Sequence, residues 1–414
     1  MNLYLFNDND RASTFGIGTY LQELTNALED SSIHVHIIHL HSDRKEFETV
    51  ITNQVEHWYI PEVQNNNTFS GSVQKVESYL QNVIYLLLLH IKDAEDLVFH
   101  FNYNTCWLLA KELKAKFNCT TVTTVHYLKW ALYFQGNLQK LHAIKLKFKN
   151  QRNQLEQFIY KNDEYERQLF KETDHLIALS HDMKNSLCSE YQIAPKKIIV
   201  ISNGLSDMIS IPQNNNDVLR RKWGLAEKEL LILFAGRLDP DKGVLFLIRA
   251  FHKVLEVIPN CRLMIAGSGE YDIYFRESKN ICSKITFTGL LGKKELHELY
   301  QIADIGVIPS LYEPFGYVSV EMMMHRLPII AVATAGLDEV VDEKCGIKIP
   351  VIEYSDKVEI DTNLLADKII YLLEHREEAN QLGNNARKRY EERYSKNIFR
   401  ENMLNFYLSI YSSK

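Results

Sequence analysis

Short apolar runs rich in β-branched residues alternate along the chain with longer stretches of helical periodicity. The first series of runs begins at Leu3, Val35, Leu97, Thr120, His175 and Lys197, and a second series begins at Leu230, Arg262, Lys284, Asp304 and Leu327. Such an alternation is typical of parallel sheets whose two faces are covered by helices. The sequence therefore predicts an α/β protein with two doubly wound, Rossmann-like domains.

A polar, turn-rich stretch around Pro212–Asp217 lies between the two series and predicts a linker. We place the N-terminal domain at residues 1–210 and the C-terminal domain at 211–396. Residues 397–414 predict a C-terminal helix that packs on either domain, with a crossing back to the N-terminal domain as one arrangement. Ligands of open parallel sheets bind at the carboxyl ends of the strands, so we expect the domains to face each other across a cleft.

Composition narrows the class of protein. Hydrophobic residues make up 46% and charged residues 24% of the chain, as in ordinary folded proteins, and the net charge of −6 gives no positive field for nucleic acid. Six scattered cysteines without a C-x-x-C pair argue against structural zinc or disulfides. The first residues lack the basic region of a secretory signal, and the longest apolar run, Val83–Leu89, is too short to span a bilayer. A cytoplasmic protein is expected.

The most informative stretch is SLYEPFGYVSVE, from Ser310 to Glu321, where a strand ends and a helix begins near Gly316. A helix N-terminus offers free backbone amides to a pyrophosphate, and glycine permits close approach. Glu313 and Glu321 flank this start, and carboxylates accept hydrogen bonds from sugar hydroxyls. The stretch predicts a diphosphate cradle with a sugar on either side; the alternative is a helix cap and a solvated glutamate.

A second stretch, AGRLDPDKG, also follows a strand and carries Arg237 and Lys242. Two cations on one loop can neutralise two phosphates without a metal. The alternative is a surface ion pair with Asp239 or Asp241.

Gly267 and Gly269 follow a third strand, in AGSGEYD, and offer close approach to a nucleotide. The dinucleotide fingerprint fails, however, because Leu21 and Asp272 stand where G-x-G-x-x-G needs its third glycine. A nicotinamide-dependent enzyme is therefore disfavoured.

Two groups of residues raise the question of a metal. Asp8 and Asp10 form a D-x-D that can hold a divalent ion, and four histidines cluster on and after one strand, namely His34, His36, His39 and His41. A polar turn and simple strand alternation explain both groups, so no metal ligand is assigned.

Read in order, these motifs resemble those of the retaining glycosyltransferases of family 4, which have the GT-B fold. The resembling segments are FGIGTY, TTVH, DHLIALSHDMKNSL, VISNGL, FAGRLDPDKG, IAGSGE, FTGLL and PSLYEPFGYVSVEMM, and they span nearly the whole chain. The resemblance implies an acceptor-side N-terminal domain and a C-terminal domain that binds a nucleotide-sugar donor.

The resemblance also implies roles for the residues of the matching motifs. Arg237 and Lys242 would bind the donor pyrophosphate, Glu321 would hold the ribose, and the backbone at 289–291 would read the base. The implied catalytic residues are His126, Arg237, Lys242 and Glu313, with His126 contacting the donor sugar. The implied donor-binding residues are Gly16, Gly18, Gly267, Gly269, Leu290, Leu291, Phe315, Gly316, Tyr317 and Glu321.

The family usually keeps the anomeric configuration and works without a bound metal or cofactor, with the leaving phosphate assisting deprotonation of the acceptor. The expected enzyme is a hexosyltransferase (EC 2.4) with a UDP- or GDP-linked sugar as donor. Two positions depart from the family pattern: Tyr127 follows His126 where many members have an acidic residue, and Phe15 precedes Gly16 in place of a second glycine.

Residues 113–155 contain no acidic residue but eight basic ones: Lys114, Lys116, Lys129, Lys140, Lys145, Lys147, Lys149 and Arg152. Aromatic and aliphatic residues are interleaved with them. The pattern indicates either a solvated helix that covers the first domain, or a helical insertion that lies on anionic lipid or receives an anionic acceptor.

Several functions stay open on the acceptor side. The expected acceptor is a saccharide or lipid-linked saccharide of cell-surface glycan synthesis, at the inner face of the membrane, and a peptide or protein side chain is the alternative. A GT-B sugar-nucleotide epimerase and a non-catalytic partner of another transferase are the rival functions. The group of Arg237, Lys242, Glu313 and Glu321 argues against the non-catalytic partner, which needs no pyrophosphate clamp.

Overall fold

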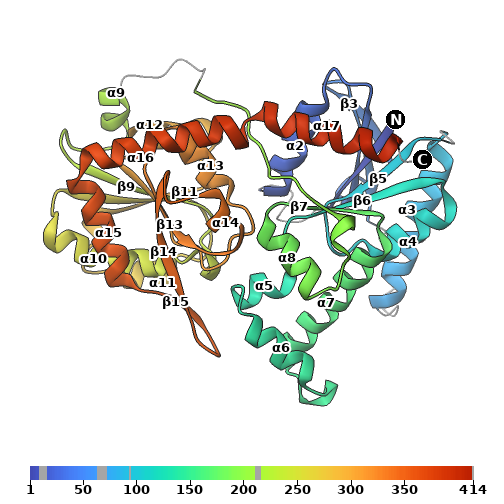
Figure 1. The fold of residues 1–414 in the computed structure, drawn as a ribbon, viewed down its shortest axis with the longest axis horizontal. Helices are drawn as coiled ribbons and strands as arrows, with labels where there is room; N and C mark the ends of the chain where they lie inside the picture. Colours follow the sequence, from blue (N-terminus) through green and yellow to red (C-terminus); the bar gives the residue numbers. More distant parts are fainter. Residues whose placement is uncertain (9–15, 63–71, 93–94, 210–215, 413–414) are drawn as a thin grey trace. The chain divides into compact units, whose positions relative to one another are not determined.

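The computed structural model describes residues 1–8, 16–62, 72–92, 95–209 and 216–412. The chain forms two compact units (Figure 1). The first unit comprises residues 1–129, 149–202 and 399–414, and the second comprises residues 130–148 and 203–398. The sequence analysis placed the boundary after residue 210 and put residues 130–148 in the N-terminal domain, so the structural division differs at both points.

The first unit is built on a sheet whose strand order is β3-β4-β2-β1-β5-β6-β7-β8. Its strands are β1 (Asn2–Asp8), β2 (His34–Ser42), β3 (Glu48–Thr52), β4 (Val55–Pro61), β5 (Leu97–Phe101), β6 (Cys119–Val125), β7 (His175–Ala178) and β8 (Ile198–Val200). Neighbouring strands pair in parallel, except that the edge strand β3 runs antiparallel to β4. The carboxyl ends of β1, β5 and β6 therefore meet at one edge of the sheet.

Helices cover this sheet. They are α2 (Gly16–Leu28), α3 (Ser72–His90), α4 (Trp107–Lys116), α7 (Gln154–Glu172), α8 (His181–Ser189) and most of α17 (Lys396–Ser412), with short turns η1 (Lys149–Gln151) and η2 (Pro195–Lys197). Asn153 and Glu156 form a capping box that starts α7. The C-terminal helix α17 packs on this unit, because Arg400 donates to the carbonyls of Ala27 and Glu29 in and after α2.

The second unit has a sheet of order β11-β10-β9-β12-β13-β14-β15. Its strands are β9 (Leu230–Ala235), β10 (Cys261–Ala266), β11 (Ile285–Gly289), β12 (Ile305–Ile308), β13 (Ile329–Ala333), β14 (Gly346–Glu353) and β15 (Val358–Ile360), and β15 alone of these runs antiparallel. The chain moves outward from β9 to β11 and then returns to the other side of β9 with β12. This reversal makes the gap between β9 and β12 a topological switch point, where open sheets bind ligands.

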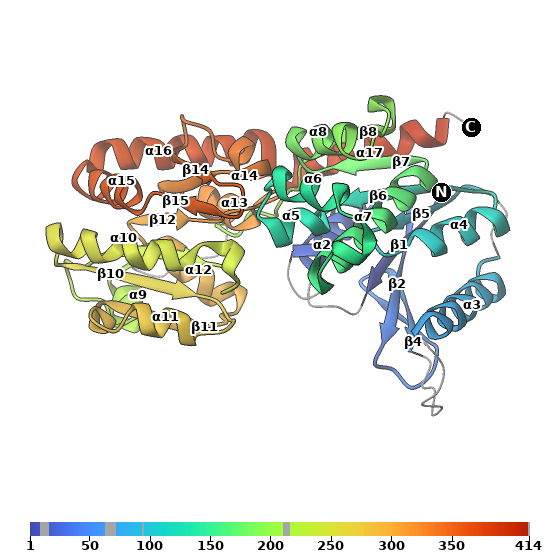
Figure 2. The same cartoon turned by 90° about the horizontal axis from the view of Figure 1, so that it is seen from below.

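Helices cover both faces of the second sheet (Figure 2). They include α9 (Asn216–Lys222), α10 (Val244–Val257), α11 (Asp272–Glu277), α12 (Lys293–Ile302), α13 (Tyr317–Met324), α14 (Ala335–Val340), α15 (Thr362–Glu374) and α16 (Arg376–Arg389), with η3 (Pro240–Lys242), η4 (Cys282–Lys284) and the π-turn η5 (Tyr390–Tyr394). Two further helices, α5 (Lys129–Phe134) and α6 (Leu138–Leu146), fall in residues 130–148 except for Lys129 and do not cover this sheet. The apolar side of α10 is buried and packs against α11 and α15, while α12 packs against α9 and α13.

The two doubly wound sheets confirm the predicted fold class. Within the described ranges, no helix combines the length and the apolar character that a membrane crossing requires.

Candidate active site

Two glycine-containing loops pack backbone against backbone at the carboxyl ends of β9 and β10. The amides of Gly236 and Leu238 donate to the carbonyls of Ala266 and Ser268, each at 2.9 Å. Gly267 has φ of 157°, and a Cβ there would lie 1.7 Å from the Gly236 carbonyl oxygen. Only glycine fits such a close approach, so the sequence of both loops fixes their contact.

A second backbone contact joins the loops that follow β9 and β12, on either side of the switch point. Gly243 starts α10 with φ of 65°, and a Cβ there would lie 1.9 Å from the carbonyl oxygen of Pro309. The amide of Leu311 donates to the carbonyl of Asp241 at 2.7 Å. These contacts bring the AGRLDPDKG and SLYEPFGYVSVE stretches together.

Lys242 and Glu313 meet where the two loops touch. The Lys242 Nζ lies 2.8 Å from Glu313 Oε2 and 3.4 Å from Asp241 Oδ2, and each of the three side chains is at most 20% exposed. Burial alone would lower the pKa of the Lys242 ammonium, but the Glu313 and Asp241 carboxylates outweigh it and raise that pKa above its ordinary value. Lys242 is therefore a permanent cation between two carboxylates.

Arg237 lies on the same loop and pairs with Asp239, with 2.9 Å between Nη1 and Oδ2. Its side chain is 34% exposed, so its other guanidinium donors reach the surface. The ion pairs with Asp239 and Asp241 that were the alternative to phosphate binding are both present. A diphosphate bound here would compete with these carboxylates for the two cations.

A helix start was predicted near Gly316, and the structure confirms it, because α13 begins at Tyr317. Gly316 has φ of 92° and precedes α13, and Glu313 lies just before it, its carbonyl accepting from the Leu337 amide at 3.1 Å. Phe315 is 3% exposed, so its side chain is buried. The first amides of α13 follow Glu313 closely in the chain and carry the positive end of the helix dipole.

Glu321 lies further along α13 and contacts α12 instead. The Tyr300 hydroxyl donates to Glu321 Oε2 at 2.7 Å. Burial raises the pKa of the Glu321 carboxyl above its ordinary value, and the bond from Tyr300 opposes part of that rise. Tyr300 was not predicted from the sequence and positions this carboxylate.

Residues 289–291, predicted to read the base, follow β11 at the same edge of the sheet. The Gly267 amide donates to the Gly289 carbonyl at 2.9 Å, which ties this loop to the glycine loop after β10. Leu290 is 62% exposed, so its side chain is accessible to a ligand. Gly269 packs its backbone against Leu238.

The first unit has its own cluster, at the carboxyl ends of β5 and β6. His126 is 9% exposed, its Nε2 lies 3.1 Å from Asn102 Oδ1, and the Tyr20 ring meets it edge to face at 4.7 Å. Burial lowers the pKa of His126 to about 3, so the ring is neutral. Tyr20 belongs to α2, which begins at Gly16, so the helix that carries the predicted glycines packs against His126 through Tyr20.

Comparison with known proteins decides the family. A model described as Glycosyltransferase Family 4 matches residues 15–207, and one described as Glycosyl transferases group 1 matches residues 215–389. The chain belongs to the family 4 glycosyltransferases. This membership confirms the resemblance found in the sequence.

Individual relatives agree with the family. An uncharacterised glycosyltransferase of Methanocaldococcus jannaschii is 36% identical over 176 residues, which are 41% of this chain and 45% of that protein. The lipopolysaccharide 1,2-N-acetylglucosaminetransferase of Salmonella typhimurium is 30% identical over 192 residues, 43% of this chain and 50% of that protein. The chain thus spans about half the length of these curated relatives.

A solved structure extends the likeness over the full length. Sucrose-phosphate synthase of Thermosynechococcus elongatus has a TM-score of 0.78 and 21% identity, and the match covers 100% of both chains. This similarity confirms the GT-B fold predicted for the chain.

This family 4 glycosyltransferase also has a buried carboxylate that sequence reasoning missed. Glu166 on α7 is 1% exposed and accepts hydrogen bonds from Asn104 at 2.8 Å, from the Lys129 amide at 2.8 Å and from the Tyr191 hydroxyl at 2.6 Å. Asn104 also donates to the Tyr127 carbonyl at 2.7 Å. Glu166 therefore holds the loop that follows His126, and only a polar residue amid the apolar positions of α7 could have signalled it.

The candidate metal groups are partly outside the described residues, since Asp10 is not described. Asp8 Oδ1 lies 2.7 Å from His41 Nδ1, and His39 Nε2 lies 2.9 Å from His57 Nδ1. Across the described ranges, no three metal-ligating side chains come together to hold an ion.

Proposed function

We propose that this protein is a retaining, metal-independent glycosyltransferase that moves a sugar from a nucleotide-diphosphate donor to an acceptor. The observation that carries the proposal is the Lys242–Glu313 pair, held at 2.8 Å across the switch point by glycine-dependent backbone contacts. A surface ion pair needs no such scaffold.

The chemistry follows from charge. In the ground state Lys242 is held by Glu313 and Asp241, and Arg237 by Asp239. A donor diphosphate competes with these carboxylates for both cations, because each of its two phosphates carries a negative charge, and a Glu313 released from Lys242 accepts hydrogen bonds from sugar hydroxyls. Cations and α13 amides then stabilise the negative charge that grows on the leaving diphosphate. The acceptor attacks the face that the diphosphate leaves and passes its proton to the departing phosphate.

The donor is a UDP- or GDP-linked sugar, with the backbone at 289–291 against the base. The first experiment is thermal unfolding with UDP, GDP, ADP and their sugar conjugates, each with and without EDTA. A saturating ligand near 100 times its dissociation constant adds about 2.7 kcal/mol to the free energy of unfolding. An EDTA-insensitive shift with one nucleotide supports the clamp, and no shift with any nucleotide contradicts it.

The turnover number of substituted enzymes tests the role proposed for Lys242. Lys242→Ala should lower kcat about a hundredfold or more, because the leaving diphosphate loses its cation. Lys357→Ala is the matched control, since Lys357 is 52% exposed and pairs with Glu359 at 2.7 Å in the same unit. A Lys242→Ala enzyme within about tenfold of wild type removes Lys242 from catalysis.

The acceptor we propose is a saccharide or lipid-linked saccharide of cell-surface glycan synthesis. The name of the Salmonella relative, a lipopolysaccharide N-acetylglucosaminetransferase, supports it. Mass spectrometry of lipid-linked saccharides and of peptides incubated with the donor separates this acceptor from the peptide alternative. Product formed without acceptor would point to an epimerase, and donor binding without nucleotide release would point to a non-catalytic partner.

Peripheral contact with an anionic membrane is the second part of the proposal. Of the basic segment 113–155, Lys114 and Lys116 belong to the end of α4 and residues 119–125 form the buried strand β6, so the predicted helical insertion comprises α5, α6 and the turn η1 after them. Beside the lysines of that part, Leu146 is 86% and Phe148 74% exposed. Apolar side chains flanked by cations are typical of surfaces that lie on anionic lipid.

Vesicle flotation tests this surface. Wild type should float with vesicles that contain anionic lipid and not with neutral ones, and Leu146→Ser with Phe148→Ser should abolish flotation. Ile51→Ser is the matched control, because Ile51 is 75% exposed on β3 without a comparable set of lysines. Absence of anionic-lipid dependence in the wild type contradicts the proposal.

A further inference from the structure

Asn102 is a buried amide whose orientation its partners determine. It follows β5 directly, is 1% exposed, and donates from Nδ2 to the Phe6 carbonyl oxygen at 3.2 Å. A backbone carbonyl only accepts hydrogen bonds, so the amide nitrogen of Asn102 must face Phe6. Its Oδ1 therefore faces His126 Nε2, at 3.1 Å.

This orientation determines where the proton of His126 is. Asn102 Oδ1 is an acceptor only, so Nε2 of His126 must carry the hydrogen. A neutral imidazole with hydrogen on Nε2 has its lone pair on Nδ1. Among the described residues, Asn102 is the one hydrogen-bond partner found for the His126 ring.

The ring plane is also fixed. Tyr20 meets His126 at an interplanar angle of 75°, and the Tyr20 hydroxyl lies 3.0 Å from Thr124 Oγ1. Thr124 in turn lies 2.7 Å from His100 Nε2, and His100 Nδ1 lies 2.7 Å from the Tyr407 hydroxyl of α17. All these side chains are buried, so this chain of hydrogen bonds holds in place the Tyr20 ring that packs against His126.

We propose that Asn102 is a positioning residue that fixes His126 in the Nε2–H tautomer, so that Nδ1 accepts a hydrogen bond from a hydroxyl of the bound sugar. The substrate half of this inference rests on the proposed function, and the tautomer half does not. Asn102 acts through His126 and need not touch the sugar.

Nitrogen-15 spectra of histidine-labelled protein test the tautomer without any assay of activity. His126 is identified among the 15 histidines as the signal lost in His126→Gln. Wild type should show the Nε2–H pattern, Asn102→Leu should lose it, and Asn102→Asp should keep it because a carboxylate still accepts from Nε2. An Nδ1–H pattern in the wild type, or an unchanged pattern in Asn102→Leu, overturns the proposal.

A control and a ligand readout complete the test. Asn7→Leu removes a comparable amide contact, from Asn7 Nδ2 to His39 Nδ1 at 3.2 Å, and should leave the His126 signal unchanged.

Adding the nucleotide sugar found by thermal unfolding should shift the His126 Nδ1 resonance, and Asn102→Leu should lower kcat about tenfold with donor KM changed much less. An unmoved Nδ1 resonance or an unchanged kcat overturns the positioning role. If no nucleotide sugar binds at all, the proposed function fails while the tautomer result stands.

Discussion

At the scale of single residues, the candidate site depends on pairs of side chains from different elements: Lys242 Nζ lies 2.8 Å from Glu313 Oε2, and Tyr300 donates to Glu321. Lys242 and Glu313 were predicted from two separate motifs, and neither motif indicates that the two side chains form an ion pair. Glu321 was predicted beside the same cradle, yet its hydrogen bond is to Tyr300 on α12. Asn102 was missed because its role exists only through partners from β1 and β6, which come together in the folded sheet.

The buried Glu166 carboxyl makes a pH prediction at this scale. Burial raises its pKa from 4.5 to about 7, even though three donors favour its charged form. A carboxyl with a raised folded pKa stabilises the fold below its unfolded pKa, and this stabilisation is lost as pH rises through the folded pKa. Between pH 5 and pH 8, wild type should lose about 2 kcal/mol of unfolding free energy relative to Glu166→Gln.

Denaturant unfolding of both proteins across this pH range measures the difference. Buried neutral histidines such as His100 and His126 give the opposite slope at acidic pH, but they are present in both proteins and cancel in the comparison. Equal pH profiles for wild type and Glu166→Gln would show that the carboxyl is ionised in the fold at all these pH values.

At the scale of elements, the predicted apolar runs match, in sheet order, the strands from β2 to β8 of the first sheet and from β11 to β13 of the second, whereas β3, β4, β14 and β15 were not predicted. A strand covered on both faces is a continuous apolar run, which is why β5 and β9 stand out in the sequence. The edge strand β3 is largely exposed and pairs with β4 through a turn at Asn53 and Gln54, both with positive φ. Its residues have no buried face, so no apolar pattern indicates it.

The prediction at the scale of elements concerns Gly243, which lies where the loops after β9 and β12 touch. Gly243 and Gly224 have nearly the same backbone, with φ of 65° and 68°, so alanine costs each about 1 kcal/mol in backbone strain. Only at Gly243 would the new Cβ meet a backbone atom, the Pro309 oxygen at 1.9 Å; at Gly224 nothing lies within 4 Å. Gly243→Ala should therefore destabilise by about 3 kcal/mol or more and weaken the thermal shift caused by the nucleotide.

Gly224→Ala is the matched control in the same unit. Thermal unfolding with and without nucleotide should show a small loss of stability and an unchanged nucleotide shift for this variant. Equal losses in the two variants would mean that the loops after β9 and β12 can separate without cost, and the scaffold argument for the Lys242–Glu313 pair would fail.

At the scale of the whole molecule, two features of the chain path could not be predicted. Residues 130–148 group with the second unit because Asn137 Nδ2 donates to the Tyr354 carbonyl at 2.7 Å and Gly136 packs on Tyr312. These partners lie far away in the sequence, and no local pattern links them. The boundary between the units at residue 203 was not predicted either, because the polar stretch around Pro212–Asp217 led us to place it after residue 210.

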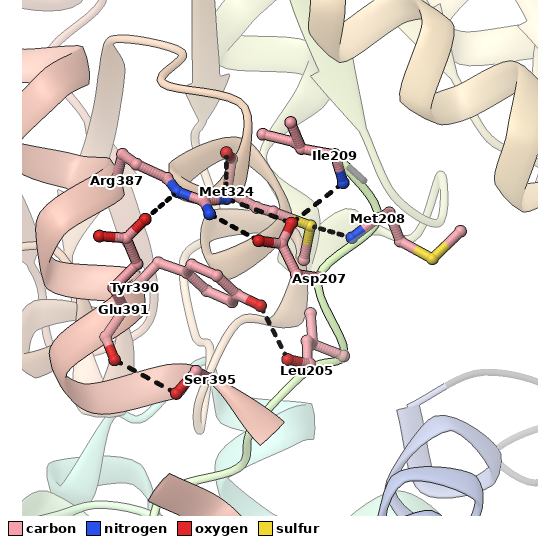
Figure 3. Close-up of polar contacts among 9 residues, drawn as sticks. All are labelled: Leu205, Asp207, Met208, Ile209, Met324, Arg387, Tyr390, Glu391 and Ser395. Atoms are coloured by element: carbon pink, nitrogen blue, oxygen red, sulfur yellow. Dashed lines mark hydrogen bonds and ion pairs between the residues drawn. The ribbon is translucent and has the colours of Figure 1, made fainter. Parts of the chain in front are cut away.

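Polar contacts hold residues 205–209, with which the chain enters the second unit, against α13, α16 and η5 (Figure 3). We call this set of contacts the clasp. Asp207 receives two hydrogen bonds from Arg387 of α16, at 3.2 and 2.5 Å, and Arg387 also donates to the carbonyl of Met324, the last residue of α13. The Met208 amide donates to the Met324 sulfur at 3.2 Å, and the Tyr390 hydroxyl donates to the Leu205 carbonyl at 2.9 Å. The clasp therefore joins this segment to α13, the helix that follows Gly316.

Arg387→Met should loosen the clasp without unfolding the unit. The Arg387 side chain is only 14% exposed and its bond to Asp207 is bidentate, whereas Lys388 and Glu392 on the same helix form an exposed pair at 3.7 Å. We expect amide hydrogen exchange in residues 203–209 to rise about fivefold in Arg387→Met, the equivalent of about 1 kcal/mol, and to stay unchanged in Lys388→Ala. The Ile209 amide is the most direct reporter, because it donates to Asp207 Oδ1 at 3.0 Å. Unchanged exchange at Ile209 in Arg387→Met would contradict a role for Arg387 in holding this segment.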